Sequence, residues 1–409
     1  MTLSPIKQDT RRFIGGAAFA HCIFTLFWSA DTLTKSGVAS LGLALIYAST
    51  AFFAFYLRRQ VYSSIKRSVI LLAFPVIAMV STLWSIDPST TLRGGIQMVI
   101  TVLIGIVIGV LLDLRGIVTC TAVALTIGLL MCGVTYFLGI WPPFFDKNDV
   151  FIGAYPQKNL LGHAMVVLFI IAWLSIFAGD RRTRVRLGFV VIAMISAVLV
   201  IVSHSASALG SMVASPLIAT VIGLYRNIGR WPIVFAWAIV TTIAALAFAF
   251  VIVGINPTDV VLDMLGRDAS LTGRTAFWQY GMDIAKQRPL DGIGYLAFWS
   301  SEDYSAIVSV WRKQNGDGVN GFHNLFIEVL VATGIPGLLA LLAGLGLSLK
   351  RVLLDSANNQ TMNGVIASVL VITMIGLAAF DNKLVRPHEI GVILLSAFTV
   401  ASLREKHSS

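Results

Sequence analysis

The sequence predicts an all-α polytopic membrane protein with about twelve transmembrane helices, and three observations support this fold class. Hydrophobic residues make up 57% of the 409 residues and charged residues only 12%, which is too apolar for a soluble multi-domain protein. About twelve apolar segments are long enough, or nearly so, to cross ~30 Å of hydrocarbon. The Lys and Arg residues are also distributed unevenly among the connections between these segments.

The predicted transmembrane segments run along the whole chain, with one long polar interruption before the tenth. They cover residues 13–31, 37–57, 68–85, 94–112, 116–138, 159–178, 187–203, 206–225, 231–254, 323–348, 362–380 and 389–403. The first segment lacks a small-residue cleavage site, so we expect a transmembrane helix there rather than a signal peptide. The last segment is short. We see no internal repeat, and residues 1–409 are expected to form a single integral membrane domain.

The basic residues predict that both termini lie in the cytoplasm. Eighteen of the 30 Lys and Arg residues fall on the same side as the termini, and six of the other twelve lie within the long polar segment, residues 255–322. Long translocated segments follow the positive-inside rule poorly, so the informative ratio is 18 to six. In a bacterium this topology places residues 255–322 on the periplasmic face of the inner membrane. The net charge of +10 therefore reflects topology and does not indicate nucleic acid as a partner.

Residues 255–322 are an inserted segment between the ninth and tenth transmembrane helices. A rough apolar stripe predicts a surface helix over residues 273–286, closed by Pro289. A glycine-bearing turn follows at residues 291–295, and residues 300–320 are polar with turn signals. The segment is too small for an independent domain, so we expect a catalytic or lid segment against the membrane face.

His323 and Asn324 stand where the chain re-enters the membrane. A histidine at this boundary can act as a general base near neutral pH. The alternative is an interfacial anchor, with Asn324 as the N-cap of the tenth transmembrane helix. Glu328 lies about one turn deeper, where a carboxylate needs a polar partner. It either orients His323 or pairs with a basic residue.

Several cations at the periplasmic surface are candidate ligands for a diphosphate. Arg274, in the sequence Thr272-Gly273-Arg274, begins the predicted surface helix, where a guanidinium and helix N–H groups can bind phosphate oxygens together. Arg267, Lys286 and Arg288 are close in sequence. These residues form either a diphosphate cradle or a basic face that contacts solvent and lipid headgroups.

Two further polar stretches flank predicted transmembrane segments. Lys158 precedes the sixth segment and is either a cationic ligand or a lysine whose amine reaches the membrane surface. His163, five residues later, is expected to be a satisfied core residue. Residues 203–207, Ser-His-Ser-Ala-Ser, form a tight turn in which His204 either lines a cavity or simply suits the turn.

No metal or cofactor site is predicted. The three cysteines lie within predicted transmembrane segments without a Cys-x-x-Cys motif. No Asp-x-Asp motif occurs, and the chain carries neither a nucleotide-binding fingerprint nor a Gly-x-Ser-x-Gly elbow.

Three phrases of the sequence resemble the O-antigen ligase and polysaccharide polymerase superfamily. They are Leu265-Gly-Arg-Asp-Ala-Ser-Leu-Thr-Gly-Arg-Thr-Ala-Phe-Trp278, Arg288-Pro-Leu-Asp-Gly-Ile-Gly-Tyr-Leu-Ala-Phe-Trp299, and His323-Asn324 followed by Gly334-Ile-Pro-Gly337. The stretch Lys158-Asn-Leu-Leu-Gly162 is also similar. The resemblance covers residues 150–345 by motif and is greatest to the rhizobial-type exopolysaccharide-production polymerases.

The resemblance implies a metal-independent, inverting glycosyl transfer in the periplasm from a glycan on undecaprenyl diphosphate. His323 would be the catalytic base, and Arg274 with Lys158 would bind the diphosphate. Many members carry an arginine in the patch corresponding to residues 203–207, which is absent here. Either His204 takes part of that role, or fewer cations hold the diphosphate.

Three functions remain possible from the sequence. A polymerase would extend a glycan acceptor, with a chain-length regulator as a further partner. A ligase would transfer the finished glycan to lipid A–core. A transporter of lipid-linked glycans is the third, but such proteins usually show internal repeats and polar residues at mid-membrane.

Overall fold

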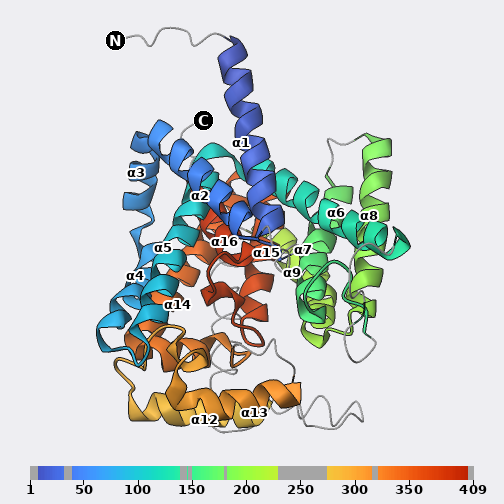
Figure 1. Ribbon diagram of the computed structural model, residues 1–409. Coiled ribbons are helices and arrows are strands. Elements are labelled where there is room, and N and C mark those ends of the chain that lie inside the picture. The colour runs from blue at the N-terminus through green and yellow to red at the C-terminus, as the bar shows by residue number, and fades with distance from the viewer. Residues whose placement is uncertain are drawn as a thin grey trace.

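Helices dominate the computed structural model, which describes residues 8–31, 39–138, 145, 150–178, 182–228, 274–315 and 321–403 (Figure 1). The α-helices are α1 (Gln8–Trp28), α2 (Ala39–Tyr56), α3 (Arg58–Arg67), α4 (Ala73–Val80), α5 (Pro88–Leu111), α6 (Leu114–Leu138), α7 (Lys158–Ile176), α8 (Thr183–Val202), α9 (Ala206–Ile228), α12 (Arg274–Gln287), α13 (Ser305–Asn315), α14 (Leu325–Asn359), α15 (Met362–Leu377) and α16 (Ile390–Ala401). Short 3₁₀ turns are η1 (Val69–Leu72), η2 (Ser81–Trp84), η3 (Ala297–Trp299), η4 (Glu302–Tyr304) and η5 (Lys383–Val385). One bridge, between Phe145 and Phe151, is the only β pairing within the described residues.

The all-α class is confirmed, and each predicted transmembrane segment except residues 231–254 overlaps a helix or a helix with its adjoining 3₁₀ turns. Residues 231–254 lie outside the described residues. Six described helices are long and apolar enough to cross a membrane, and α2 with α3 would make a seventh despite a bend of 95° between them. Four further apolar stretches are shorter. They are Gly15–Trp28 in α1, Val69–Trp84 from η1 to η2, α15 and α16. The total of about twelve stays a prediction.

The helices form a bundle with a separate layer across one end. In Figure 1, α12 and α13 lie side by side across the lower end, while α1 begins at the upper end, where α3 also lies. The surface helix predicted for residues 273–286 is confirmed as α12. The layer is thus at the opposite end of the bundle from the first residues of α1.

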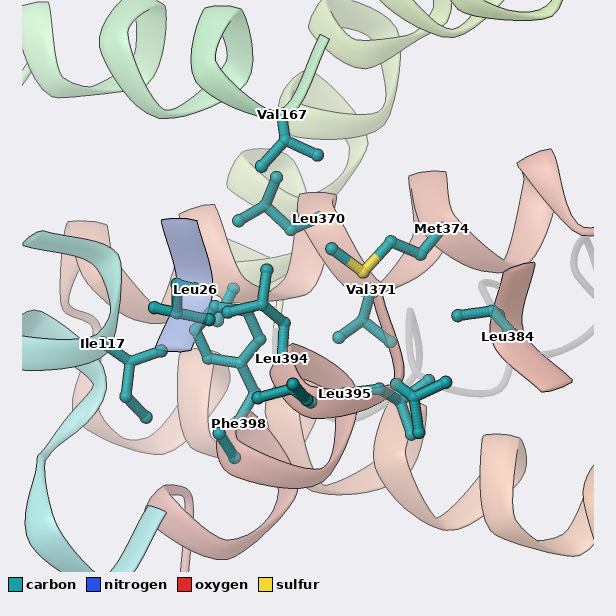
Figure 2. Packing of buried hydrophobic residues seen from close by; sticks show 14 of the residues in the cluster. Leu26, Ile117, Val167, Leu370, Val371, Met374, Leu384, Leu394, Leu395 and Phe398 are labelled. Carbon is teal, nitrogen blue, oxygen red and sulfur yellow. The ribbon is translucent and has the colours of Figure 1, made fainter. Parts of the chain in front are cut away.

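The hydrophobic core is centred on α16, a short apolar helix. All of its residues from Val392 to Ala401 are buried. Figure 2 shows Leu394, Leu395 and Phe398 surrounded by side chains of other helices, among them Leu26 of α1 and Ile117 of α6. At 12 residues, α16 is about 18 Å long, well short of ~30 Å of hydrocarbon. It is accommodated because other helices enclose it.

Two glycines allow α5 to lie directly against α16. A Cβ atom at Gly105 would lie 2.6 Å from the carbonyl oxygen of Ile393, and one at Gly109 would lie 2.6 Å from that of Ala397. The glycines are four residues apart and so share one face of α5. Small residues at this spacing let membrane helices approach closely and gain packing energy where lipid offers no hydrophobic driving force.

The helix α14 is broken at Gly334, which has φ 65° and ψ −164°. The turn at residues 289–295 fills the break. The N–H groups of Ile293 and Gly294 donate to Val331 and Ala332 at 2.9 and 3.0 Å, and the N–H of Ile335 donates to Pro289 at 2.8 Å. The carbonyl and amide groups released by the break are therefore satisfied by the inserted segment.

The layer over the bundle has its own aromatic core. Phe277 of α12 and Trp311 of α13 have ring centroids 4.0 Å apart, and Phe298 and Phe322 pack beside them. The helix α13, within the segment expected to be polar with turn signals, was not predicted from the sequence. Val308 and Trp311 lie one turn apart on α13, and both are buried in this cluster.

We expect Gly109→Val to lower the thermal unfolding midpoint of the purified protein, because the added side chain would push α16 away from α5. Overpacking of this kind typically costs about 1–3 kcal/mol. The matched control is Gly188→Val on α8, where a Cβ would meet nothing within 4 Å. Equal midpoints for the two variants, measured in the same detergent, would contradict the close packing of α5 on α16.

Candidate functional site

His323 occupies a strained turn at the entrance to α14. Its φ is 52°, a left-handed conformation that non-glycine residues adopt rarely. The next residue, Asn324, is the N-cap of α14 and accepts hydrogen bonds from the N–H groups of Phe326 and Ile327 at 3.0 and 3.2 Å. The capping role considered for Asn324 is therefore confirmed, and His323 stands just outside the helix with its side chain half-buried.

The turn is held in place by Glu328, which is buried. One carboxylate oxygen accepts the indole N–H of Trp299 at 2.8 Å, and the other accepts the backbone N–H of Phe322 at 2.8 Å. The side chain of Asn382 also hydrogen-bonds to Glu328. From α12, the indole N–H of Trp278 donates to the Phe322 carbonyl at 2.8 Å. Glu328 thus fixes Phe322, the residue before His323, by a hydrogen bond, rather than forming an ion pair with a basic residue among the described residues.

The loop between α15 and α16 brings an aspartate to the same place. The N–H of Leu325 donates to the carbonyl of Ala378 at 2.9 Å, which ties the start of α14 to the end of α15. Asn382 lies so close to Gly321 that a Cβ there would be 2.0 Å from the amide nitrogen. Between these two contacts the loop carries Asp381, which is buried.

Asp381 is surrounded by positive or protonatable groups. Nδ1 of His163, from α7, lies 3.3 Å from its Oδ2, and Nζ of Lys383 lies 3.9 Å from the same oxygen. Burial alone would raise the pKa of the Asp381 carboxyl, but the hydrogen bond from His163 and the charge of Lys383 outweigh it. His323 contributes in the same direction. The resulting pKa lies below its ordinary range, so Asp381 is a carboxylate at neutral pH.

His163 links Asp381 to the turn at residues 203–207. Its Nε2 lies 3.0 Å from Oγ of Ser207, whose hydroxyl is in turn 3.4 Å from that of Ser205. The prediction that His163 is a satisfied buried residue is confirmed in its burial and hydrogen bonding. Its partners, however, belong to the polar cluster around His323. The exposed His204 has φ 49° and is at the tip of that turn.

A pocket opens beside Asp381 with apolar walls and a polar end. It contains about 640 Å³ of empty space, counting the part open to solvent, and α6, α7, α15 and α16 supply its apolar walls. Its polar lining includes Asp31, His163, Asp381, Lys383 and Glu389. Such a pocket suits an amphiphile, with its polar head group at the end lined by these charged side chains and its hydrocarbon tail along the apolar walls.

The other predicted site residues are placed as follows. Lys158 is the first residue of α7, and Arg274 is the first residue of α12, one turn before Trp278. Arg288 forms an ion pair with Asp291 through Nη2 and Oδ2, so part of its charge is already compensated. Arg267, Thr272 and Gly273 lie outside the described residues.

From the sequence alone, salt-bridge or lipid-headgroup roles are the default expectation for Asp381, Lys383 and Arg386, and nothing connects His163 with them. The available signal was the run Asp381-Asn-Lys-Leu-Val-Arg-Pro-His-Glu389, which is too polar for the short connection between two apolar segments. In the structure Asp381, Asn382 and Glu389 are buried, and Arg386 pairs with Glu389 at 3.7 Å.

We expect Glu328→Gln to lower the unfolding midpoint, because an amide offers one acceptor where the carboxylate receives two N–H donors, and a buried donor would be left unsatisfied. Such a loss costs about 1–3 kcal/mol. Glu302→Gln, the same change at an exposed position of η4, is the control. A Glu328→Gln variant as stable as the control would show that the carboxylate does not hold the His323 turn.

Comparison with known proteins agrees with these features. Residues 191–342 match the family model described as O-Antigen ligase, a range that includes α12, α13 and the His323 turn. The chain is also 27% identical over 415 residues to the Exopolysaccharide production protein ExoQ of Rhizobium meliloti (strain 1021), covering 98% of this chain and 90% of that relative. The chain is thus a multi-pass membrane protein in which residues 191–342 are similar to the O-Antigen ligase family, and it is similar over nearly its whole length to an exopolysaccharide production protein.

Proposed function

We propose that this protein polymerises an exopolysaccharide on the periplasmic face of the inner membrane. The donor is a glycan on undecaprenyl diphosphate, and the growing glycan supplies the acceptor hydroxyl. The transfer inverts the anomeric centre and needs no metal ion or cofactor. The observation that carries the proposal is the placement of His323 on a fixed turn that adjoins the loop of the buried Asp381, whose pKa the charge of His323 helps to lower, beside a pocket of amphiphilic lining.

In this mechanism His323 takes the proton of the acceptor hydroxyl. The hydroxyl oxygen forms a bond to the anomeric carbon of the donor while the bond from that carbon to the diphosphate oxygen breaks. The electron pair of the broken bond leaves with undecaprenyl diphosphate. Asp381 favours the protonated imidazole electrostatically, since a carboxylate stabilises a nearby cation.

The leaving diphosphate requires cations at its oxygens. We assign this role to Arg274 at the start of α12 and to Lys158 at the start of α7, where helix N–H groups add to the positive potential. Lys383 and Arg288 are weaker candidates, because Asp381 pairs with Lys383 at 3.9 Å and Asp291 pairs with Arg288. The apolar walls of the pocket would receive the first part of the lipid tail.

Ligation to lipid A–core is the alternative, favoured by the description of the matching family model. The two reactions share the donor and the base and differ in the acceptor. We place polymerisation first because the match to the exopolysaccharide production protein extends over nearly the whole chain.

We expect His323→Asn to abolish transfer while leaving the fold and donor binding largely intact. Asparagine tolerates the left-handed backbone at this position better than alanine does, so the variant removes the base without straining the turn. The measurement is analysis of surface and lipid-linked glycans in a deletion strain complemented with wild type or variant. Loss of general base catalysis should reduce the rate by a factor of about 10² or more.

The glycan profile also separates the functions. A ladder collapsed to single repeat units supports the polymerase. Long undecaprenyl-linked chains that never reach lipid A would instead establish the ligase. A profile unchanged in the deletion strain, or full activity of the folded His323→Asn variant, would contradict the proposal.

We expect Arg274→Ala to weaken binding of an undecaprenyl-diphosphate donor by roughly ten- to a hundredfold, the loss of one charge-assisted contact of about 1.5–3 kcal/mol. Arg288→Ala is the matched comparison and should have the smaller effect, since its guanidinium already pairs with Asp291. Donor binding by the purified variants, titrated in one detergent, is the measurement. An Arg274→Ala affinity equal to wild type would remove this residue from the diphosphate site.

A further inference from the structure

A bend between α2 and α3 places a basic helix, α3, at the end of the bundle opposite the α12–α13 layer (Figure 1). The axis of α3 turns 95° from that of α2, and α3 carries Arg58, Arg59, Lys66 and Arg67. Two of these cations lie over exposed aromatic rings: Arg58 is 5.3 Å from the centroid of Phe55, and Lys66 is 4.5 Å from that of Tyr62. A basic helix with aromatic neighbours, turned away from its transmembrane partner, is suited to the membrane interface.

The junction of α3 with η1 is fastened to α14. The guanidinium of Arg351 donates from Nη1 to Oγ of the buried Ser68 at 2.6 Å and from Nη2 to the carbonyl of Arg67. This guanidinium therefore faces inward and serves the fold. The junction is therefore fixed by the protein itself and needs no ligand to hold it.

A groove lies between this junction and the second half of α14. It holds about 760 Å³ of empty space, counting the part open to the surroundings. The apolar floor consists of Val69, Ile70, Ala343, Gly346 and Leu347, and Arg67 with Lys350 completes the lining. Val69 is 62% exposed in the protein alone, so the floor needs an apolar occupant from outside.

The two positive charges of the groove indicate which class of lipid it binds. Neither Arg67 nor Lys350 forms an ion pair with a carboxylate within the part of the chain that the structure describes. A zwitterionic lipid would bring its own ammonium group to these two cations. An anionic phospholipid offers a phosphate to the cations and an acyl chain to the apolar floor, without an opposing charge.

We propose that this groove binds one anionic phospholipid, with the phosphate between Arg67 and Lys350 and an acyl chain along Val69, Ile70 and Leu347. The site lies at the other end of the bundle from His323 and does not depend on the proposed glycan transfer. The positive-inside rule alone would account for these basic residues without any bound lipid.

The test is lipid binding to the purified full-length protein. Native mass spectrometry measures binding while dioleoylphosphatidylglycerol or dioleoylphosphatidylcholine is titrated. We expect phosphatidylglycerol to bind at least tenfold more tightly, since each basic residue near anionic lipid contributes about 1 kcal/mol. Arg67→Gln combined with Lys350→Gln should remove this preference. Ala343→Phe should weaken binding while both cations remain, because the ring would fill the groove.

Arg59→Gln is the control, since Arg59 is exposed on the same helix but does not line the groove. It should bind phosphatidylglycerol as wild type does. Equal binding of the two lipids, or equal losses in the control and the double variant, would overturn the site in favour of diffuse surface charge. If the double variant does not fold, Ala343→Phe decides: wild-type binding by it would also refute the groove.

Discussion

The break in α14 at Gly334 is the constraint on which the rest of the architecture depends. A helix interrupted within a membrane protein releases backbone donors and acceptors that lipid cannot satisfy. The turn at residues 289–295 satisfies them with its own backbone, and it has room because neither Gly292 nor Gly334 carries a side chain. A Cβ at Gly292 would lie 2.6 Å from the carbonyl oxygen of Val331, and one at Gly334 would lie 2.6 Å from the carbonyl carbon of Leu290.

This docking fixes the layer that covers the bundle. The same turn reaches η2 and α5, where the N–H of Tyr295 donates to Ser81 at 3.1 Å and its carbonyl accepts from Thr91 at 2.9 Å. The aromatic cluster then extends the attachment to α12 and α13. The start of α14, the turn of His323 and the start of α12 are thereby held at one end of the bundle, which is the geometry that the proposed transfer needs.

Local patterns were sufficient for most of the helices and for the extent of α12, because apolar segments of membrane length and a helix with Pro after it are signals written in neighbouring residues. They also located the Asn324 cap, while the catalytic role of His323 stays a proposal. They did not identify the pairing of His163 with Asp381, whose positions are separated by more than half of the chain. That pairing depends on how α7 and α15 pack, and one sequence contains no record of such a contact. The helix α13 was missed for a related reason: the aromatic partners that stabilise it, among them Phe277 and Phe298, come from α12 and η3.

The central position of α16 has a consequence for biosynthesis. This helix follows all the others described, yet it packs against α5, α6 and α14, and its Leu394 and Phe398 lie close to Leu26 of α1 (Figure 2). The loop before it supplies Asp381. A chain emerging from the ribosome therefore inserts most of its helices before the element that fills their centre exists. Asp381, in the loop directly before that late helix, joins His163 and Lys383, so the order of synthesis delays the assembly of the polar cluster until the membrane domain is nearly complete.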